Sequence, residues 1–214
     1  TADDAATEDG AALDGTFTAS DVDADDTLTF SADAVDGFNL TGADWTFDPS
    51  NAAYQDLAEG ATRDVTVNYS VTDSQNVSDA QSFVITVTGV NDDPVPTFAT
   101  QQDVTEGANV SDQLTSTDVD AGATATYEEV GATAGLTINL DGTFTFDAAN
   151  AAYDSLDDGD TQTINVTYRV TDDVGATANG TFDIVVTGAN DAPVLDATAD
   201  DAATEDGAAL SGTF

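Results

Sequence analysis

The chain has 214 residues, of which 42 are acidic and only two are basic, so its formal net charge at pH 7 is −40. A polyanion of this kind excludes nucleic acid and anionic membrane surfaces as partners, because both require a basic patch. Cysteine and histidine are absent, which excludes a disulfide framework, thiol chemistry and the usual base for a serine or threonine nucleophile.

Apolar residues in the first half alternate with polar ones in short runs, the pattern of half-buried β-strands. Trp45 lies in one of these runs and is expected in the core, because its counterpart in the second half is Phe144. Residues 51–60 instead predict a turn or a single helical turn, with Tyr54 and Leu57 pointing inward. No useful helix and no apolar run of about 20 residues is found, so no membrane span is expected. The expected strands lie at residues 11–19, 28–30, 38–40, 45–47, 65–71 and 83–87.

The heptapeptide at residues 88–94 follows the last of these strands and returns almost unchanged at residues 187–193. Each copy begins with Thr-Gly and carries Asn-Asp shortly before a proline. Proline cannot continue a central strand and pushes the preceding residue toward extended geometry, so the chain leaves the sheet without folding back. We interpret each copy as a joint between domains, whose short oxygen-bearing side chains suit a hard cation.

The two halves of the chain are repeats of one another. Tyr54 and Tyr153 lie 99 residues apart, and the same spacing separates Val71 from Val170. We therefore divide the chain into two repeats and the beginning of a third, with boundaries at residues 1–93, 94–192 and 193–214.

The beginning of the third repeat resembles the first repeat more than the second. Residues 198–214 copy residues 1–17 with one change, Asp14 to Ser211, whereas the second repeat keeps only scattered matches to that segment. We expect that this chain is a segment of a longer array in which two repeat types alternate.

About seven short strands in about 100 residues, with turn signals every 8–12 residues, are typical of an antiparallel β-sandwich with Greek-key connections. We predict an all-β chain of two tandem Greek-key β-sandwiches of immunoglobulin or cadherin type, plus the first strand of a third. That last strand, within residues 198–214, has no partner of its own and would have to borrow one if it is ordered.

Two acidic loops carry the clearest chemical signal, Asp21-Val22-Asp23 and Asp118-Val119-Asp120. Alternate side chains on an extended segment point to one side, so each loop presents two carboxylates to one ion. Calcium takes about six to eight oxygen ligands, so further groups must come from turns, strand ends and joints. The predicted metal ligands are Glu8, Asp21, Asp23, Asp56, Glu59, Asp73, Asn91, Asp92, Asp93, Glu106, Asp118, Asp120, Asp172, Asn190 and Asp191.

End-to-end sandwiches would bring the closing turn and the joint of the first repeat against the opening loops of the second. One site is therefore expected between the repeats. It would gather Glu8, Asp56, Glu59, Asn91, Asp92 and Asp93 with Asp118, Asp120 and Asp172.

Four markers in order resemble a known kind of repeat: the run at residues 15–30, Asn-Ala-Ala-Tyr at 51–54, Tyr-Ser-Val-Thr-Asp at 69–73 and Gly-Val-Asn-Asp-Asp-Pro at 89–94. They are similar to the VCBS-type, cadherin-like repeats of giant bacterial surface adhesins of the RTX type. The resemblance covers nearly the whole chain. It implies export by type I secretion and calcium-stiffened extender modules. By the cadherin pattern it also implies inter-domain calcium ligands at Glu8, Glu59, Asn91, Asp92, Asp118, Asp120 and Asp172.

We therefore expect structural extender repeats of a long extracellular adhesin, rigidified by Ca²⁺ at the joints and projecting a distal binding domain from the cell surface. Their partners would be neighbouring repeats of the same chain. One alternative is a self-assembling filament or surface-layer subunit, in which identical chains complete each other's sandwiches by strand exchange. Another is a calcium-dependent glycan- or peptide-binding module. Neither an enzyme nor membrane insertion is expected.

Overall fold

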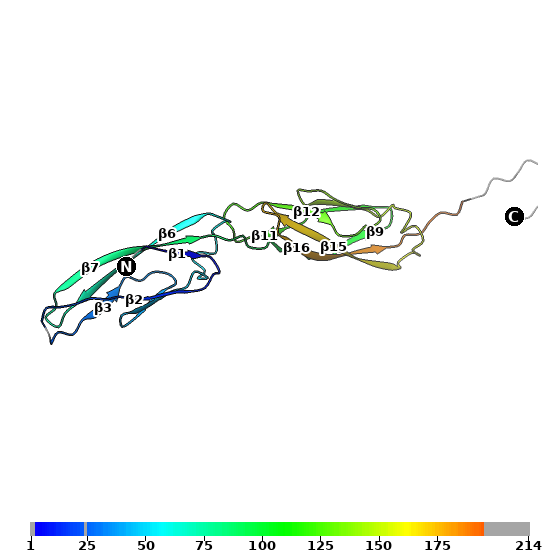
Figure 1. Cartoon of the computed structure of the whole chain (residues 1–214). Helices are drawn as coiled ribbons and strands as arrows, with labels where there is room; N and C mark the ends of the chain where they lie inside the picture. Colours follow the sequence, from blue (N-terminus) through cyan, green and yellow to red (C-terminus); the bar gives the residue numbers. More distant parts are fainter. Residues whose placement is uncertain (1–2, 24, 195–214) are drawn as a thin grey trace, which may run out of the picture.

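The computed structural model describes residues 3–23 and 25–194, and within them the chain forms two β-sandwiches placed end to end (Figure 1). These residues contain strands, turns and bends but no helix. Accordingly, the described part of the chain has no helical segment with the length and apolarity needed to cross a membrane.

The first sandwich pairs a four-stranded sheet, in the order β1-β7-β6-β3, with a three-stranded sheet, in the order β2-β5-β4. Its long β6 and β7 are antiparallel over eleven residue pairs, whereas β1 pairs with β7 in parallel. The strand bounds are Asp4–Thr7 (β1), Leu13–Thr16 (β2), Thr29–Ala32 (β3), Phe38–Thr41 (β4), Asp44–Phe47 (β5), Thr62–Thr72 (β6) and Ser78–Thr88 (β7).

The second sandwich repeats this plan, with sheets in the orders β9-β16-β15-β12 and β10-β14-β13. It also contains a two-stranded pair, β8 with β11, made by the segment that follows the joint. The strand bounds are Val95–Pro96 (β8), Gln102–Thr105 (β9), Asn109–Gln113 (β10), Ser116–Thr117 (β11), Ala125–Glu129 (β12), Leu136–Ile138 (β13), Thr143–Asp147 (β14), Thr161–Asp172 (β15) and Thr177–Thr187 (β16).

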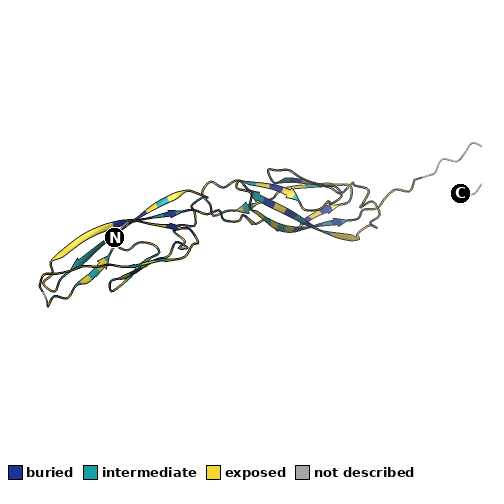
Figure 2. Ribbon diagram, in the orientation of Figure 1, coloured by how far each residue is buried: buried dark blue, intermediate teal, exposed yellow. Residues whose placement is uncertain are grey.

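Each sandwich has its own core. Buried residues recur along the long strands of both sandwiches (Figure 2). Val67, Phe83 and Ile85 are almost completely buried in the first core, and Val166, Phe182 and Ile184 hold the matching places in the second. Successive strand residues point to opposite faces, so the polar residues between them face water. The period-two pattern therefore specifies which face of each sheet is covered.

The prediction of two tandem sandwiches is confirmed, and Trp45, Tyr54 and Leu57 are buried as expected. The structure differs from the prediction at the first strand. Asp4–Thr7 was not predicted, because it is short and buries only Ala6. It also pairs in parallel, whereas an antiparallel sandwich was expected. The predicted strand of a third repeat lies outside the described residues.

Trp45 is accommodated by a glycine on the neighbouring strand. Gly15 lies opposite Trp45 in the β2–β5 pairing, and a Cβ added to Gly15 would stand 2.6 Å from the indole ring. In the second sandwich the equivalent pair is Asp112 opposite the smaller Phe144. A larger tryptophan in this position therefore requires a glycine across from it.

We expect Gly15→Ala to destabilise the first sandwich by about 1–3 kcal/mol, because the added methyl overpacks the core. Urea unfolding followed by far-ultraviolet circular dichroism measures this in every variant, including those that lack Trp45. Trp45→Phe should rescue the variant, since the smaller phenylalanine ring of the second sandwich tolerates a side chain on the residue opposite it. An unchanged midpoint for Gly15→Ala would show that the indole moves aside freely.

Candidate metal centre between the two sandwiches

Glu8 reaches the joint because β1 runs parallel to the end of β7. The register places Thr7 beside Thr88, and the Glu8 amide then donates to the Thr88 carbonyl at 2.8 Å. The Glu8 carboxylate accepts the Val90 amide at 3.1 Å and a hydrogen bond from Gln55 at 3.3 Å. Its side chain is only 2% exposed. A carboxylate at the end of a short edge strand is thus folded under the joint.

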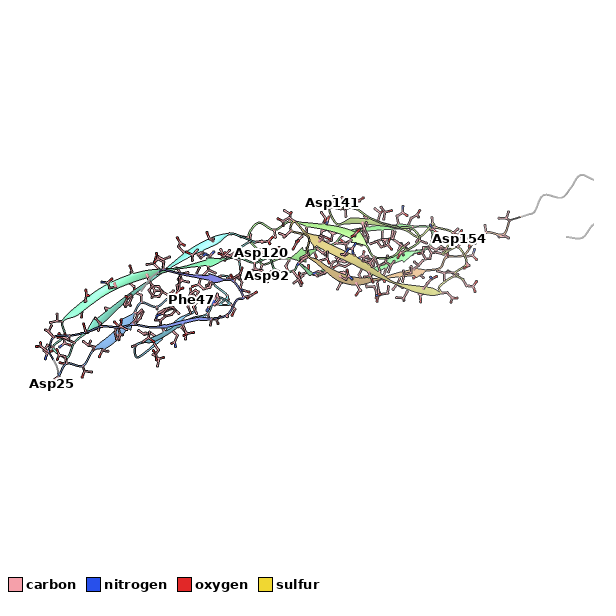
Figure 3. All side chains as sticks on the ribbon, in the orientation of Figure 1. Asp25, Phe47, Asp92, Asp120, Asp141 and Asp154 are labelled. Carbon is pink, nitrogen blue, oxygen red and sulfur yellow. The ribbon has the colours of Figure 1, made fainter. Side chains whose placement is uncertain are left out.

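The second sandwich meets the joint with three aspartates. Asp120 is 7% exposed and its amide donates to the Asp118 carboxylate at 3.0 Å, which closes a tight local turn. The Asp92 amide donates to the Asp120 carboxylate at 3.0 Å. The Asn91 side-chain amide donates to the Asp172 carboxylate at 2.9 Å. Both bonds join one sandwich to the other, and Asp92 and Asp120 lie together between the two units (Figure 3).

The turn at residues 51–60 supplies the opposite wall. The Ala121 amide donates to the Asp56 carbonyl at 3.0 Å. The Asp56 carboxylate itself is exposed and forms an ion pair with Arg63 at 2.9 Å. A small cavity of about 60 Å³ lies between the sandwiches, and its lining includes Glu59, Asn91 and Asp120. Asp56 therefore contributes its backbone oxygen to the contact, while its carboxylate stabilises the turn.

Two carboxylate oxygens in this joint are buried without any hydrogen-bond donor, one on Asp92 and one on Asp120. Burial raises the pKa of Asp92 above its ordinary value, and the negative charges of Asp120 and Asp9 raise it further. Burial likewise raises the pKa of Glu8, where the Val90 amide opposes the shift and Asp92 adds to it. An unpartnered buried carboxylate oxygen is costly unless a proton or a cation reaches it.

Asp172 has the opposite balance. Burial acts to raise its pKa, but hydrogen bonds from Asn91 and from the backbone amides of Gly175, Ala176 and Val174 outweigh it. The pKa of Asp172 is therefore held below its ordinary value. This carboxylate stays ionised and carries a fixed negative charge into the joint.

The metal-free protein should be more stable in mild acid than at neutral pH. The pKa values of Glu8 and Asp92 are raised in the folded chain, so the folded state binds more protons than the unfolded state. Their stabilising contribution is complete below their ordinary pKa values and is lost as the pH rises through the raised values. Asp172, with its lowered pKa, contributes in the opposite sense, and only its own protonation at lower pH removes that contribution.

Thermal melts of metal-stripped protein from pH 4 to pH 8 measure this slope. The other acidic residues add a general slope through self-repulsion, so the comparison is with the double variant Glu8→Gln, Asp92→Asn. We expect the double variant to lose part of the fall in midpoint between mild acid and neutral pH. If the unfolding midpoints of the two proteins depend equally on pH, then Glu8 and Asp92 do not have raised pKa values in the folded chain.

The outer end of the first sandwich carries the equivalents of the joint aspartates. There, carboxylate oxygens of Asp21, Asp26 and Asp73 lie within 4.8 Å of one another, the one such group of three among residues 3–23 and 25–194. Asp23 is exposed and its amide donates to Asp21 at 2.9 Å. The predicted ligands Asp21 and Asp73 are thus brought together, with Asp26 in place of Asp23.

The outer end of the second sandwich repeats the other half of the joint. The Ala189 amide donates to the Glu106 carboxylate at 3.0 Å, just as the Val90 amide donates to Glu8. Asn190 donates to the Asp191 carbonyl at 3.1 Å, as Asn91 does to Asp92. Glu106 is only half-buried, whereas Glu8 is buried. Docking of the next sandwich therefore accounts for the burial of Glu8.

Two residues at the joint were not predicted from sequence. Asp9 adopts a left-handed backbone (φ 56°) after β1, and its negative charge acts on both Glu8 and Asp92. Gln55 donates to Asp9 at 3.1 Å as well as to Glu8. The position of Asp9 beside Glu8 was the available signal. Asp93, by contrast, was predicted as a ligand and is exposed.

The donors gathered at the joint are carboxylate, amide and carbonyl oxygens. Hard cations such as Ca²⁺ prefer this set of ligands. The two buried oxygens without donors are suited to binding a cation, because burial without any partner would be costly. Among the described residues at this joint, no three carboxylates have oxygens within 4.8 Å of one another. Cation binding would therefore draw their side chains inward.

No protein-family model matches the chain, and no curated protein sequence matches it. Among solved structures it is similar to Drosophila N-cadherin EC1-4, with a TM-score of 0.53 and 14% identity over 88% of this chain and 49% of that one. Human Protocadherin-24 EC1-2 gives a TM-score of 0.51 and 16% identity, over 88% and 94% of the two chains.

The chain spans only part of some longer neighbours. It covers 27% of the Protocadherin GammaB4 extracellular domain, matched over 75% of this chain with 18% identity and a TM-score of 0.48. At such identities the likeness concerns the fold alone. Both structures with the higher TM-scores are cadherin ectodomain segments. The chain therefore has a cadherin-like fold of tandem β-sandwich domains.

Proposed function

We propose that this chain is a pair of structural extender repeats from a long extracellular adhesin of the VCBS type, stiffened by Ca²⁺ held between successive sandwiches. The observation that carries the proposal is the pair of buried carboxylate oxygens without donors, on Asp92 and Asp120, at the contact between the two units. The proposed units are residues 1–93 and 94–192, with a third beginning at 193.

The geometry of the joint supports a role in stiffness. Hydrogen bonds between the sandwiches already link Asn91 to Asp172, Asp92 to Asp120 and Ala121 to Asp56. The carboxylates beside those bonds repel one another and favour separation of the units. A bound cation supplies the positive charge that turns this repulsion into attraction. The proposed ligands at the joint are Glu8, Glu59, Asp92, Asp118, Asp120 and Asp172, with Asn91 and the Asp56 carbonyl beside them.

The outer ends of the sandwiches support repetition of the same site. One end offers Asp21 and Asp73, and the other offers Glu106, Asn190 and Asp191. Each is half of the joint described above, so consecutive repeats would complete it. The fold is that of cadherin ectodomains, which supports an adhesive, extracellular setting for such an array.

Small-angle X-ray scattering tests the proposal. With Ca²⁺ we expect the chain to scatter as one extended rod, and after chelation as two sandwiches with a flexible joint. Mg²⁺ at matched ionic strength is the control, because it dehydrates reluctantly and requires octahedral geometry. Equal stiffening by Mg²⁺ would reduce the effect to charge screening and would contradict a calcium site.

A further inference from the structure

The short segment that follows the first edge strand differs between the two repeats. Asp9 follows Glu8 in the first repeat, whereas Gly107 follows Glu106 in the second. The positions are equivalent, because the amides of Glu8 and Glu106 each donate to the last residue of the neighbouring strand, β7 or β16. This end of the first sandwich therefore carries a carboxylate that the second sandwich lacks at the same place.

The backbone at this position favours glycine. Gly107 has a φ of 78° and Asp9 has a φ of 56°, both in the left-handed region. Apart from glycines, only Asp9 and Asn76 have a positive φ among the described residues. Left-handed geometry is unfavourable for a residue with a side chain, although aspartate and asparagine tolerate it better than most. The first repeat thus has an aspartate where glycine would fit with less strain, which indicates a role for its carboxylate.

The turn that faces the joint differs in the opposite sense. It carries Asp154 and Asp157 in the second repeat, but Gln55 and Ala58 at the equivalent positions of the first. The positions are equivalent because the two turns have the same pattern of backbone hydrogen bonds. In the second repeat both aspartates line one cavity with residues 189–191 of its joint. The first repeat therefore lacks these turn carboxylates and has a carboxylate on the segment after β1 instead.

Gln55 connects that segment to the turn. Its side-chain amide nitrogen donates to Asp9 at 3.1 Å and to Glu8 at 3.3 Å, so the two carboxylates share one donor. The negative charge of Asp9 acts on Asp92 as well as on Glu8. Asp9 is exposed, whereas Glu8 is buried. The Asp9 carboxylate therefore lies on the solvent side of the group of acids at the joint.

Two buried oxygens in this group give a separate indication of a cation. One belongs to Asp120, whose side chain is 7% exposed, and the other to Asp92, and neither has a donor. Gln55 donates to Glu8 and Asp9 and leaves both of these oxygens without a partner. A Ca²⁺ ion bound to them would require further oxygen ligands, since calcium takes about six to eight. Because Asp9 is exposed, its side chain can turn toward such an ion without leaving a packed position.

We propose that Asp9 is a calcium ligand at the joint and supplies the carboxylate that the turn of the first repeat lacks. This inference rests on the proposed function, because it adds a ligand to the same site. Gln55 holds Asp9 beside Glu8 in the metal-free chain, and the ion takes the place of this donor when it binds. The two repeat types then differ in the source of one ligand, which is the segment after β1 in the first and the turn in the second.

Calcium titrations followed by nuclear magnetic resonance test the proposal. The backbone amides of Val90 and Asp92 are the reporters, because both donate to carboxylates of the joint and not to the outer ends of the sandwiches. We expect Asp9→Gly, which copies the second repeat, to raise the dissociation constant about tenfold. In chelator the same variant should unfold at an equal or higher temperature, since it relieves left-handed strain and removes one repulsive charge.

Asp93→Asn is the matched control. Asp93 is exposed and its charge also acts on Asp92, so this variant removes one negative charge from the same joint without removing a proposed ligand. It should change the dissociation constant less than about twofold at an ionic strength of about 0.15 M, where exposed charges are screened. Adding Gln55→Asp to Asp9→Gly returns a carboxylate from the turn, as in the second repeat, and should recover most of the affinity.

The outcomes separate this inference from the proposed function. Equal weakening by Asp9→Gly and Asp93→Asn would overturn the inference, since Asp9 would then act only as a nearby charge. Unchanged calcium affinity in Asp9→Gly would overturn it as well. In both cases the proposed function stands if Asp120→Asn still weakens binding at the same reporters. If calcium shifts neither reporter in the wild-type chain, both the inference and the proposed function are wrong.

Discussion

Replacing Asp120 by Asn is expected to lower stability in the presence of Ca²⁺ and to raise it in its absence. With calcium, the variant loses a ligand and most of the binding free energy. At a hundredfold excess of ion over its dissociation constant, one site adds roughly 2.7 kcal/mol. For a domain of this size that corresponds to a loss of roughly 10–20 °C in the unfolding midpoint.

Without the ion, the same substitution removes an uncompensated buried charge. One oxygen of Asp120 is buried with no donor, and Asp92 and Glu8 lie in its field. An amide at this position keeps an acceptor for the Asp92 amide and adds a donor for the neighbouring carboxylates. We expect a gain of about 1 kcal/mol in metal-stripped buffer.

Thermal unfolding of the two proteins with calcium, magnesium and chelator measures both effects. Asp14→Asn is the matched control, because Asp14 is exposed on β2 and the third repeat carries Ser211 in its place. Asp14→Asn should shift the unfolding midpoint only slightly, and by the same amount in calcium and in chelator. The same sign of change for Asp120→Asn in calcium and in chelator would refute the assignment of Asp120 as a ligand.

Gly89→Ala is expected to destabilise the first sandwich by about 3 kcal/mol. A Cβ on Gly89 would stand 2.3 Å from the Leu57 carbonyl oxygen and 2.5 Å from that of Ala58. These are backbone atoms, which cannot swing away as a side chain can. Gly89 also donates to the Ala61 carbonyl at 2.8 Å and accepts from Gly60 at 3.1 Å, so it holds the turn against the joint.

Urea unfolding monitored by tryptophan fluorescence checks this, since Trp45 reports on the first sandwich. The control is Val90→Ala, one residue further along, where the side chain is 41% exposed and its removal should cost little. Gly188→Ala should act in the same way on the second sandwich, because its Cβ would stand 2.4 Å from the Asp157 carbonyl oxygen. A midpoint for Gly89→Ala within error of wild type would show that the backbone at Leu57 and Ala58 moves away from the added methyl at little cost.

The sequence predicts the long strands well and the short first strand poorly. β6 alternates apolar and polar residues from Val65 to Val71, and β7 carries Phe83, Ile85 and Val87 at alternate positions, enough for the period to identify half-buried strands. β1 buries one alanine, so it leaves no period to detect. Its parallel pairing with β7 is a long-range contact that no local pattern encodes, and that pairing is what carries Glu8 to the joint.

The candidate site is likewise part local and part tertiary. The Asp118–Asp120 turn is a short-range motif, and its hydrogen bond forms within the loop that the sequence marks. Asp56 was expected to offer its carboxylate, but Arg63 engages that group and leaves the carbonyl facing Ala121. The first loop brings Asp26 rather than Asp23 to Asp21 and Asp73. Side-chain choices of this kind depend on neighbours that are distant in sequence.

The sequence by itself determined the architecture: strand periodicity, two prolines at equivalent joints and a near-exact internal repeat define tandem all-β units rich in acidic loops. Only the tertiary structure decided which acids converge. Convergence depends on docking two sandwiches end to end, which buries Glu8, Asp120 and Asp172 and leaves two carboxylate oxygens without donors. Burial and charge proximity are properties of that contact, and no residue carries them in the sequence alone.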